Sequence, residues 1–326
     1  PYLELLRRGG GILSTVRATR AASFTELVEG AERRARQAIA HGTTTLEIKT
    51  GYRLDEAGEI ELLRVIAALS KRLPIRVVST LLAAHVVPPE FADQRSAYLE
   101  LCERLHLKAR DEGLAAFVDV FCEQEAFSLA ESERLLTHAK GLGFGLKLHA
   151  EQFTASGAAE LAARLGAVSA EHLEALTDAS LAVLAASERP PVAVLLPGVT
   201  FHLNEAQTPR ARSLIEAGVP VALATDFNPG SSFTLSMPMI LALAARLLHM
   251  SVAEAVVAAT INAAHAVGLG ASTGSLEPGK RADLIVCDVP DYRFLAYAFG
   301  SNPVTRVVAG GTLVPPAGGG VQSDSR

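Results

Sequence analysis

Three polar side chains, two histidines and an aspartate, each follow a short apolar run of the chain. His149 ends G-L-K-L-H, His172 ends A-V-S-A-E-H, and Asp226 ends V-A-L-A-T-D. A short apolar run is typical of a buried strand, so each side chain is expected where a strand gives way to a loop. Two imidazoles and a carboxylate that converge there can bind one hard or borderline metal ion, whose other positions hold water.

Each of the three residues also has a plainer interpretation. His149 is favoured as a ligand over a hydrogen-bonded core histidine. His172 fits a second ligand or a purely structural histidine, but a group that handles the proton of an attacking water is preferred. Asp226 fits a ligand that orients this water, or else an ordinary Asx-Pro-Gly turn. The serines at 231–232 are expected to cap a helix that begins near Thr234, which leaves Asp226 free.

Polar residues beside these three are candidates for contacts to a substrate. Gln152 follows His149 by three residues, and its amide can donate and accept hydrogen bonds but cannot act as a general base. Glu151 can titrate but is expected to point away from His149. Tyr52 and His85 also lie just past the ends of expected strands. Hydrogen bonds to a polar ligand are further expected from the turn after Asp226, through Asn228, the backbone of Gly230, and Ser231.

Strand-like and helix-like segments alternate along the chain and must position these residues. The expected strands cover 43–49, 75–82, 115–122, 145–149, 167–172, 192–196 and 219–226. Amphipathic helices are expected between them, such as 23–40 with a capping box at Ser23 and Glu26. Glycines that end helices are expected at Gly42, Gly113, Gly143, Gly166 and Gly218. This alternation predicts an α/β fold with a parallel sheet and helices outside, and a closed barrel requires an eighth strand.

The two ends of the chain differ from this pattern. The first residues predict a helix over 2–8 and a loop over 9–17. After residue 250 a helix leads into two segments that read as short antiparallel strands with Gly and Pro turns. We therefore expect a metal-dependent hydrolase barrel over 1–270, the C-terminal part of a small β-sandwich module over 271–314, and a disordered tail over 315–326.

Composition excludes several classes of partner. The 326 residues are 49% apolar and 20% charged, which predicts a large core, and the net charge of −5 with scattered Lys and Arg disfavours nucleic acid. No stretch is long and apolar enough to predict a membrane span. The three cysteines form no C-x-x-C pair, and Cys122 is expected in a buried strand. A reducing, cytoplasmic compartment is therefore expected. Five of the other histidines are interpreted as structural or surface residues, namely His41, His106, His138, His249 and His265.

Several motifs resemble the amidohydrolase superfamily, and within it the imidazolonepropionase family. The more specific ones are K-T-G-Y-R-L-D, H-A-E-Q-F and T-D-F-N-P-G-S, whereas G-S-L-E-P-G-K-R-A-D-L-I-V is generic to the superfamily. The resemblance implies a TIM-like (β/α)8 barrel that binds one Zn or Fe ion and is consistent with a homodimer. It implies hydrolysis of the cyclic C–N amide bond of 4-imidazolone-5-propanoate to N-formimidoyl-L-glutamate in histidine degradation.

The resemblance also implies a role for each candidate residue. His149 and Asp226 match the metal ligands, and His172 matches the catalytic histidine, assisted by Gln152 and Asp226. The substrate contacts match Tyr52, His85, Gln152, Asn228, Gly230 and Ser231.

One part of the family pattern is missing from the sequence. The family carries a His-X-His pair on its first barrel strand and a substrate-binding Arg shortly after it, and the sequence contains neither feature at a matching place. The expectation is that this strand lies upstream of Pro1. Two alternatives remain. A related deaminase would act on another small heterocycle, but such enzymes typically use Glu near the position of Gln152. An inactive truncated barrel is the other.

Overall fold

A curled parallel sheet forms the centre of the computed structural model, which describes residues 11–315. Its seven strands lie side by side in the order in which they occur along the chain, and every neighbouring pair is parallel. All seven predicted strands are confirmed, as β1 (Thr45–Lys49), β2 (Arg76–Ala84), β3 (Phe117–Cys122), β4 (Gly145–Ala150), β5 (Ser169–His172), β6 (Val192–Leu195) and β7 (Val221–Leu223).

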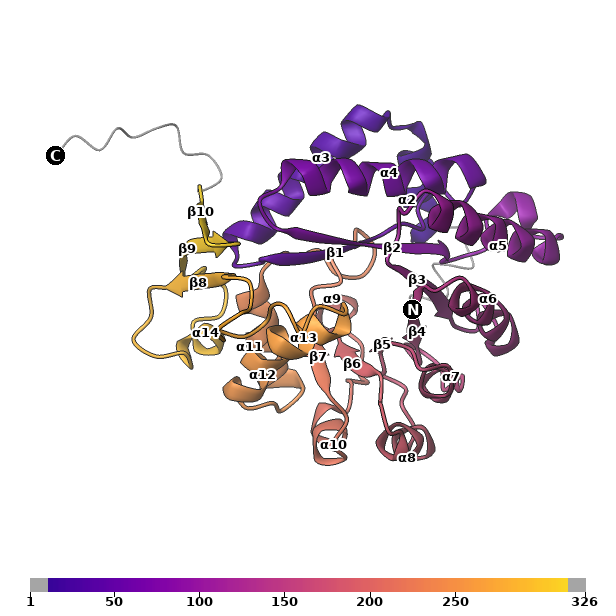
Figure 1. Cartoon of the computed structure of the whole chain (residues 1–326). Helices are drawn as coiled ribbons and strands as arrows, with labels where there is room; N and C mark the ends of the chain where they lie inside the picture. The colour runs from indigo at the N-terminus through magenta and orange to yellow at the C-terminus, as the bar shows by residue number, and fades with distance from the viewer. Residues whose placement is uncertain (1–10, 316–326) are drawn as a thin grey trace.

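Helices surround this sheet on its outer side (Figure 1). They are α2 (Ile12–Ala21), α3 (Phe24–Ala40), α4 (Glu56–Arg72), α5 (Arg95–Asp111), α6 (Leu129–Gly141), α7 (Ala158–Leu165), α8 (Asp178–Ala186), α9 (Pro197–Leu203), α10 (Ala211–Glu216), α11 (Met237–Leu247), α12 (Val252–Ala259) and α13 (Ile261–Ala266), and a 3-10 turn covers Pro89–Phe91. The fold is thus the predicted α/β barrel type. Within residues 11–315, β1 pairs only with β2 and β7 only with β6, so the sheet keeps two open edges.

Local sequence signals explain where several helices begin and end. The Ser23 hydroxyl accepts the Glu26 N–H at 3.3 Å, and the Glu26 carboxylate accepts the Ser23 N–H at 2.8 Å, which confirms the predicted capping box. The predicted helix-ending glycines are also confirmed, because Gly42, Gly113, Gly143, Gly166 and Gly218 all have positive φ angles.

Two local predictions were wrong. The loop expected over 9–17 is instead largely helix α2, because Ile12 and Val16 lie one turn apart and are both buried in the core. The helix expected near Thr234 begins at Met237 and is capped by Ser236, whose hydroxyl accepts the N–H of Met239 at 3.3 Å. The expected helix over 2–8 lies outside the described residues, as does the expected tail beyond residue 315.

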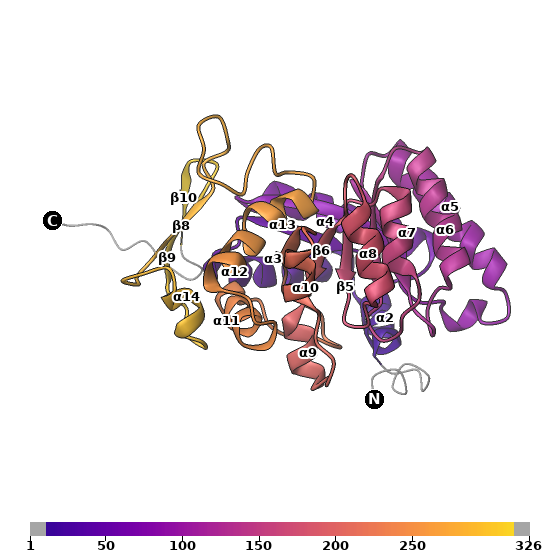
Figure 2. The ribbon, with the colours of Figure 1, turned by 90° about the horizontal axis from the view of Figure 1, so that it is seen from below.

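A small antiparallel sheet follows the barrel helices, as predicted. It contains β8 (Leu284–Cys287), β9 (Val304–Ala309) and β10 (Thr312–Val314), and the short helix α14 (Phe294–Tyr297) lies between the first two strands. Figure 2 shows it at one end of the molecule. Val307 and Val314 are buried in one apolar cluster with Val28 of α3 and Val65 of α4. The boundary at residue 270 stays a prediction.

Buried side chains fill the space between the sheet and its helices. Every residue of β3 is buried, which confirms the interpretation of Cys122. Tyr98 of α5 is fully buried, and its hydroxyl donates to the Ala83 carbonyl at 2.8 Å. None of the helices in residues 11–315 is long and apolar enough to cross a membrane.

A pair of histidines, of which His106 is buried and His138 half-buried, predicts how stability depends on pH. The Nδ1 atoms of His106 and His138 lie 3.1 Å apart, and burial, helped by His138, lowers the pKa of His106 to about 3. An unfolded histidine has a pKa near 6.5, so the unfolded chain binds more protons and stability falls as the pH drops below about 6.5. Between pH 7 and pH 5, the free energy of unfolding should fall about 2 kcal/mol less in His106→Gln than in the wild type, as measured by urea unfolding.

The exposed His202 provides the matched control. His202→Gln should follow the wild-type pH dependence. Parallel curves for all three proteins would contradict the role of His106.

Candidate active site

Aromatic rings from four strand ends form a row across the carboxyl edge of the sheet. Tyr52, after β1, and His85, after β2, have ring centroids 5.2 Å apart. The His85 ring lies 6.3 Å from the His149 ring, and the His149 ring lies 5.3 Å from the His172 ring. The carboxyl ends of parallel strands meet at one edge, which explains why residues distant in sequence converge here. This is the face on which barrel enzymes build their sites.

One buried carboxylate holds the loop that carries Tyr52. Glu59 of α4 is fully buried and accepts the N–H groups of Gly51 at 2.8 Å, Arg53 at 2.9 Å and Leu54 at 2.9 Å. Charged acceptors make strong hydrogen bonds with backbone N–H groups. Glu59 therefore fixes the backbone on both sides of Tyr52.

His85 is neutral in this environment. Burial, together with the neighbouring His149, lowers the pKa of His85 to about 3. Its Nδ1 lies 3.1 Å from the carbonyl oxygen of Gly51, so the neutral ring donates its Nδ1–H there. The Nε2 atom is then a hydrogen-bond acceptor.

Asp226 lies near both histidines of the sheet. Strand β7 ends at Leu223, earlier than predicted, and Asp226 follows in a turn with a φ of 46°. Burial raises the pKa of Asp226, and the charges of His172 and His149 oppose part of this shift, which places the three groups in one electrostatic environment. The structure thus brings together the three residues with which the sequence argument began.

The turn after Asp226 is held by its own side chains. The Asn228 Oδ1 accepts the N–H groups of Gly230 and Ser231, each at 2.8 Å, and its Nδ2 donates to the Asp226 carbonyl at 2.8 Å. Ser232 does not cap a helix, because its hydroxyl donates to the Thr225 carbonyl at 2.7 Å. The role of this turn in ligand contact stays a prediction.

Gln152 lies in the loop after β4. It is 8% exposed and lines a cavity of about 60 Å³ together with Glu174, Thr200 and Glu205. Glu151 beside it is buried, and burial, assisted by Glu160, raises its pKa to about 7.

A group of charges inside the curled sheet was not predicted from the sequence. The Lys49 Nζ of β1 lies 2.6 Å from the Asp119 Oδ2 of β3 and also contacts the Glu171 carboxylate of β5. Burial alone would lower the pKa of Lys49, but Asp119 and Glu171 raise it well above its usual value. Burial would raise the pKa of Asp119, but His149 and Lys49 lower it.

A second lysine completes this ionic layer. The Lys147 Nζ lies 3.3 Å from the Glu47 carboxylate, 3.0 Å from the Ser169 hydroxyl and 2.8 Å from the Ala266 carbonyl. A signal for the layer was present in the sequence. Charged residues alternate with apolar ones in strands that otherwise read as buried, and Lys147 precedes His149 by two residues, on the same face.

Two sets of donor atoms near His149 could bind a metal ion, and they differ in which other groups they already contact. Among the described residues, Asp119, His149 and Glu171 offer ligand atoms that lie within 4.8 Å of one another. Lys49 already contacts both of these carboxylates, however, whereas the side-chain hydrogen bond of the Asp226 carboxylate comes from the neutral Asn228 amide, at 3.2 Å. An imidazole and a carboxylate, from His149 and Asp226, suit zinc or iron.

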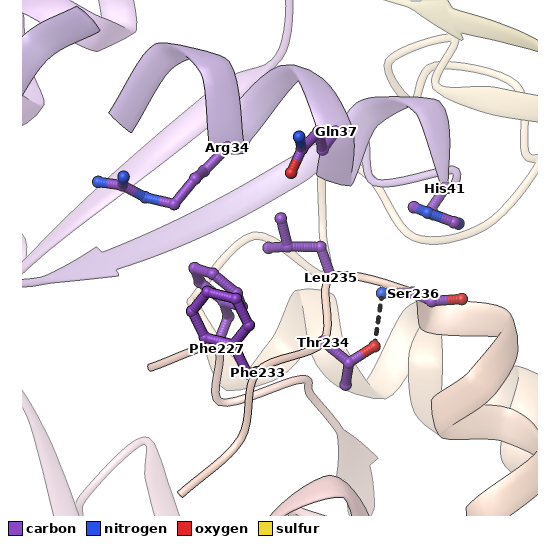
Figure 3. Close-up of a pocket in the computed structure, with 8 residues that line it drawn as sticks. All are labelled: Arg34, Gln37, His41, Phe227, Phe233, Thr234, Leu235 and Ser236. Carbon is purple, nitrogen blue, oxygen red and sulfur yellow. Dashed lines mark hydrogen bonds between the residues drawn. The ribbon is translucent and has the colours of Figure 1, made fainter. Parts of the chain in front are cut away.

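A larger cavity of about 290 Å³ lies outside this constellation, between α3 and the segment after Asp226 (Figure 3). Arg34 and Gln37 of α3, with His41 just after it, line one side, and the ring centroids of Phe227 and Phe233 lie 4.9 Å apart on the other. None of the predicted site residues lines it, so we place the chemistry at the row of rings instead.

Comparison with known proteins gives one consistent set of relatives. The profile described as "Amidohydrolase family" matches residues 13–314. An imidazolonepropionase of Symbiobacterium thermophilum is 49% identical over 97% of this chain and 75% of its own length. An imidazolonepropionase of Chloroflexus aggregans is 45% identical over 96% of this chain and 75% of its own length.

Solved structures show a similar fold in more distant proteins. An adenosine deaminase from Xanthomonas campestris with bound zinc has a TM-score of 0.72 and 24% identity, over 96% of this chain and 74% of that one. A guanine deaminase from E. coli has a TM-score of 0.72 and 15% identity, over 92% of this chain and 77% of that one. At these identities the likeness concerns the fold alone.

The ionic layer predicts a large loss of stability when its shared cation is removed. Lys49→Met leaves Asp119 and Glu171 buried without their common ammonium partner. Breaking a buried pair in this way lowers the free energy of unfolding by about 3–5 kcal/mol. Urea unfolding at pH 7 would measure this loss. Arg64→Met is the control, because it breaks an exposed pair with Glu112 and should cost less than about 1 kcal/mol. Equal losses in the two variants would refute the buried role of Lys49.

Proposed function

The chain belongs to the amidohydrolase family, and within it to the imidazolonepropionases, and we propose that the row of rings and Asp226 carry out its reaction. The reaction is hydrolysis of the cyclic C–N amide bond of 4-imidazolone-5-propanoate to N-formimidoyl-L-glutamate, a step of histidine degradation. The 49% identity over nearly the whole chain carries this conclusion. The cytoplasmic location and the homodimer stay predictions.

His149 and Asp226 are the residues that would hold the metal ion, which we propose to be zinc or iron. They offer one imidazole and one carboxylate at the ends of β4 and β7. When bound, such an ion lowers the pKa of water toward neutrality and polarises a carbonyl oxygen. Lys49 keeps the carboxylates of Asp119 and Glu171 occupied, which supports Asp226 as the ligand that remains.

His172 is the proposed group for proton transfer. Burial alone would lower its pKa, but the carboxylates of Glu174 and Asp226 raise the pKa of His172 above its ordinary value. A histidine that holds a proton more firmly can stabilise negative charge that develops on the ring carbonyl. Asp226, whose pKa burial raises, is the proposed acceptor for the proton of the attacking water.

The substrate ring is proposed to lie against the row of rings. Neutral His85 offers its Nε2 to a ring N–H, and Tyr52 packs edge-on beside it. The Gln152 amide can both donate to and accept from the substrate. Further contacts are proposed from the turn after Asp226, through Asn228, Gly230 and Ser231.

A deaminase that acts on another heterocycle is the weaker alternative. The structural likeness to the adenosine and guanine deaminases concerns the fold alone. Gln152 carries an amide at a position where a proton-shuttling carboxylate would be expected, and an amide does not titrate near neutral pH.

The proposed function is tested by incubating the purified protein, with Zn²⁺ or Fe²⁺ supplied, with 4-imidazolone-5-propanoate, guanine and adenosine in separate assays. We expect consumption of the imidazolone and formation of N-formimidoyl-L-glutamate, identified by mass spectrometry. The Symbiobacterium relative serves as the positive control. Release of ammonia from guanine or adenosine alone would establish the deaminase alternative. Turnover of none of the three compounds by protein that contains metal would support the inactive barrel.

The ligand assignment makes a separate prediction for three site variants. His149→Ala and Asp226→Asn should each lower the affinity for metal more than about 100-fold, since loss of a partner of a ligand already costs 10–100-fold. His172→Asn should keep the metal, and its kcat should fall about 10²–10⁴-fold. Equilibrium dialysis with elemental analysis gives the affinities.

The exposed His202 again offers a matched control. His202→Ala should retain both the metal and the rate. A His149→Ala protein that binds metal as tightly as the wild type would show that the ligands lie elsewhere.

A further inference from the structure

We propose that Glu174 is a positioning residue for His172, whose carboxylate holds the imidazole by Nδ1 and so directs the opposite nitrogen toward the reaction. This inference rests on the proton-transfer role proposed for His172. It concerns a residue that neither the sequence motifs nor the comparisons singled out.

The two side chains form a buried pair. The Glu174 Oε2 lies 3.6 Å from the His172 Nδ1, and the residues are 5% and 2% exposed. Neither carboxylate oxygen of Glu174 has a hydrogen-bond partner within residues 11–315, and the same holds for the His172 Nδ1. Buried polar atoms are nearly always paired, so a small rotation that closes this gap would satisfy both groups at once.

The backbone between the two residues supports the same interpretation. His172 has a φ of 79° and Leu173 a φ of 67°, and two consecutive residues with side chains rarely adopt this left-handed region. The Leu173 N–H donates to the Ala150 carbonyl at 3.1 Å, and the Ala175 N–H donates to the Glu151 carbonyl at 2.8 Å. The turn is therefore fastened to the end of β4, and it brings Glu174 back to the imidazole. Strain of this kind persists where the surroundings impose it, and it clusters at functional sites.

Other charged groups also face His172, but Glu174 is the nearest described one. Asp226 after β7 and Glu171 on β5 both act on it electrostatically, and the His149 ring lies 5.3 Å away. Of the carboxylates in residues 11–315, only Glu174 lies within ion-pair distance of its Nδ1.

An acceptor on Nδ1 has a defined chemical effect. It keeps the proton of the neutral ring on Nδ1, so Nε2 is free to take a proton and, once protonated, to give it back. It also stabilises the imidazolium form and fixes the plane of the ring. Carboxylates that orient a catalytic histidine in this way act through the histidine and do not touch the substrate.

A direct contact between Glu174 and the substrate is the competing explanation. Glu174 lines the cavity of about 60 Å³ with Gln152 and Thr200, so one oxygen can face a ligand there. The two roles differ in kinetics. A positioning residue affects kcat, whereas a residue that binds the substrate equally in the ground state and the transition state affects KM.

The test compares Glu174→Ala and Glu174→Gln with the wild type. We expect kcat to fall about 10–100-fold in Glu174→Ala, with KM and metal content unchanged. The kcat of Glu174→Gln should fall less, because the amide oxygen of Gln still accepts the His172 Nδ1–H. Glu188→Gln is the matched control, since Glu188 is exposed and does not line this cavity. A raised KM with unchanged kcat would overturn the positioning role, as would a loss of kcat that merely follows a loss of folded protein in thermal unfolding.

A second measurement does not depend on turnover. ¹⁵N-histidine NMR of the protein without substrate, at a pH high enough for the His172 ring to be neutral, reports which ring nitrogen carries the proton, with the His172 signals assigned by their loss in His172→Asn. We expect the Nδ1–H form in the wild type and in Glu174→Gln, and a shift toward the Nε2–H form in Glu174→Ala. The same tautomer in all three proteins would overturn the proposal, even if the imidazolone assay succeeds. The expected shift would uphold it, even if that assay fails.

Discussion

Charge neutralisation inside the curled sheet is the constraint on which the other features depend. An ammonium or carboxylate that is removed from water must find a partner of opposite charge. Lys49 of β1 meets Asp119 of β3 and Glu171 of β5, and Lys147 of β4 meets Glu47 of β1. None of these pairs joins strands that are neighbours in the sheet. The ion pairs therefore cross the interior, and they can form only if the sheet curls.

The site lies next to this ionic layer and depends on it. His149 follows Lys147 by two residues on β4, so the strand that supplies a charge to the interior also presents the imidazole at the carboxyl edge. The His149 Nδ1 lies 3.0 Å from the Asp119 carboxylate, which Lys49 also contacts. The position of the His149 ring therefore depends on residues of three strands, β1, β3 and β4. The same principle, a buried carboxylate that fixes a neighbouring group, is repeated by Glu59 under the Tyr52 loop.

The sequence predicted the elements whose signals are local. Every strand of the large sheet and the capping box at Ser23 follow from periodicity and from residues a few positions apart. His149, His172 and Asp226 could be placed together because parallel strands share one edge. The partners of Lys49 could not be found in this way, because they lie 70 and 122 positions away. The left-handed turn at His172 could not be predicted from the sequence either, since neither histidine nor leucine favours a positive φ.

The consecutive strand order has a consequence for the order of events in folding. Each strand from β2 to β7 pairs with the strand that precedes it in the chain, so the sheet can grow stepwise as the chain leaves the ribosome. The contact between Lys49 and Glu171 cannot form in the first steps of this growth, because the two residues are 122 positions apart in the chain. The ammonium of Lys49 can meet Asp119 once β3 has been added, but its contact with Glu171 waits for β5. Closure of the ionic layer is thus a late step, and the imidazole of His149 reaches its final surroundings only after most of the sheet has formed.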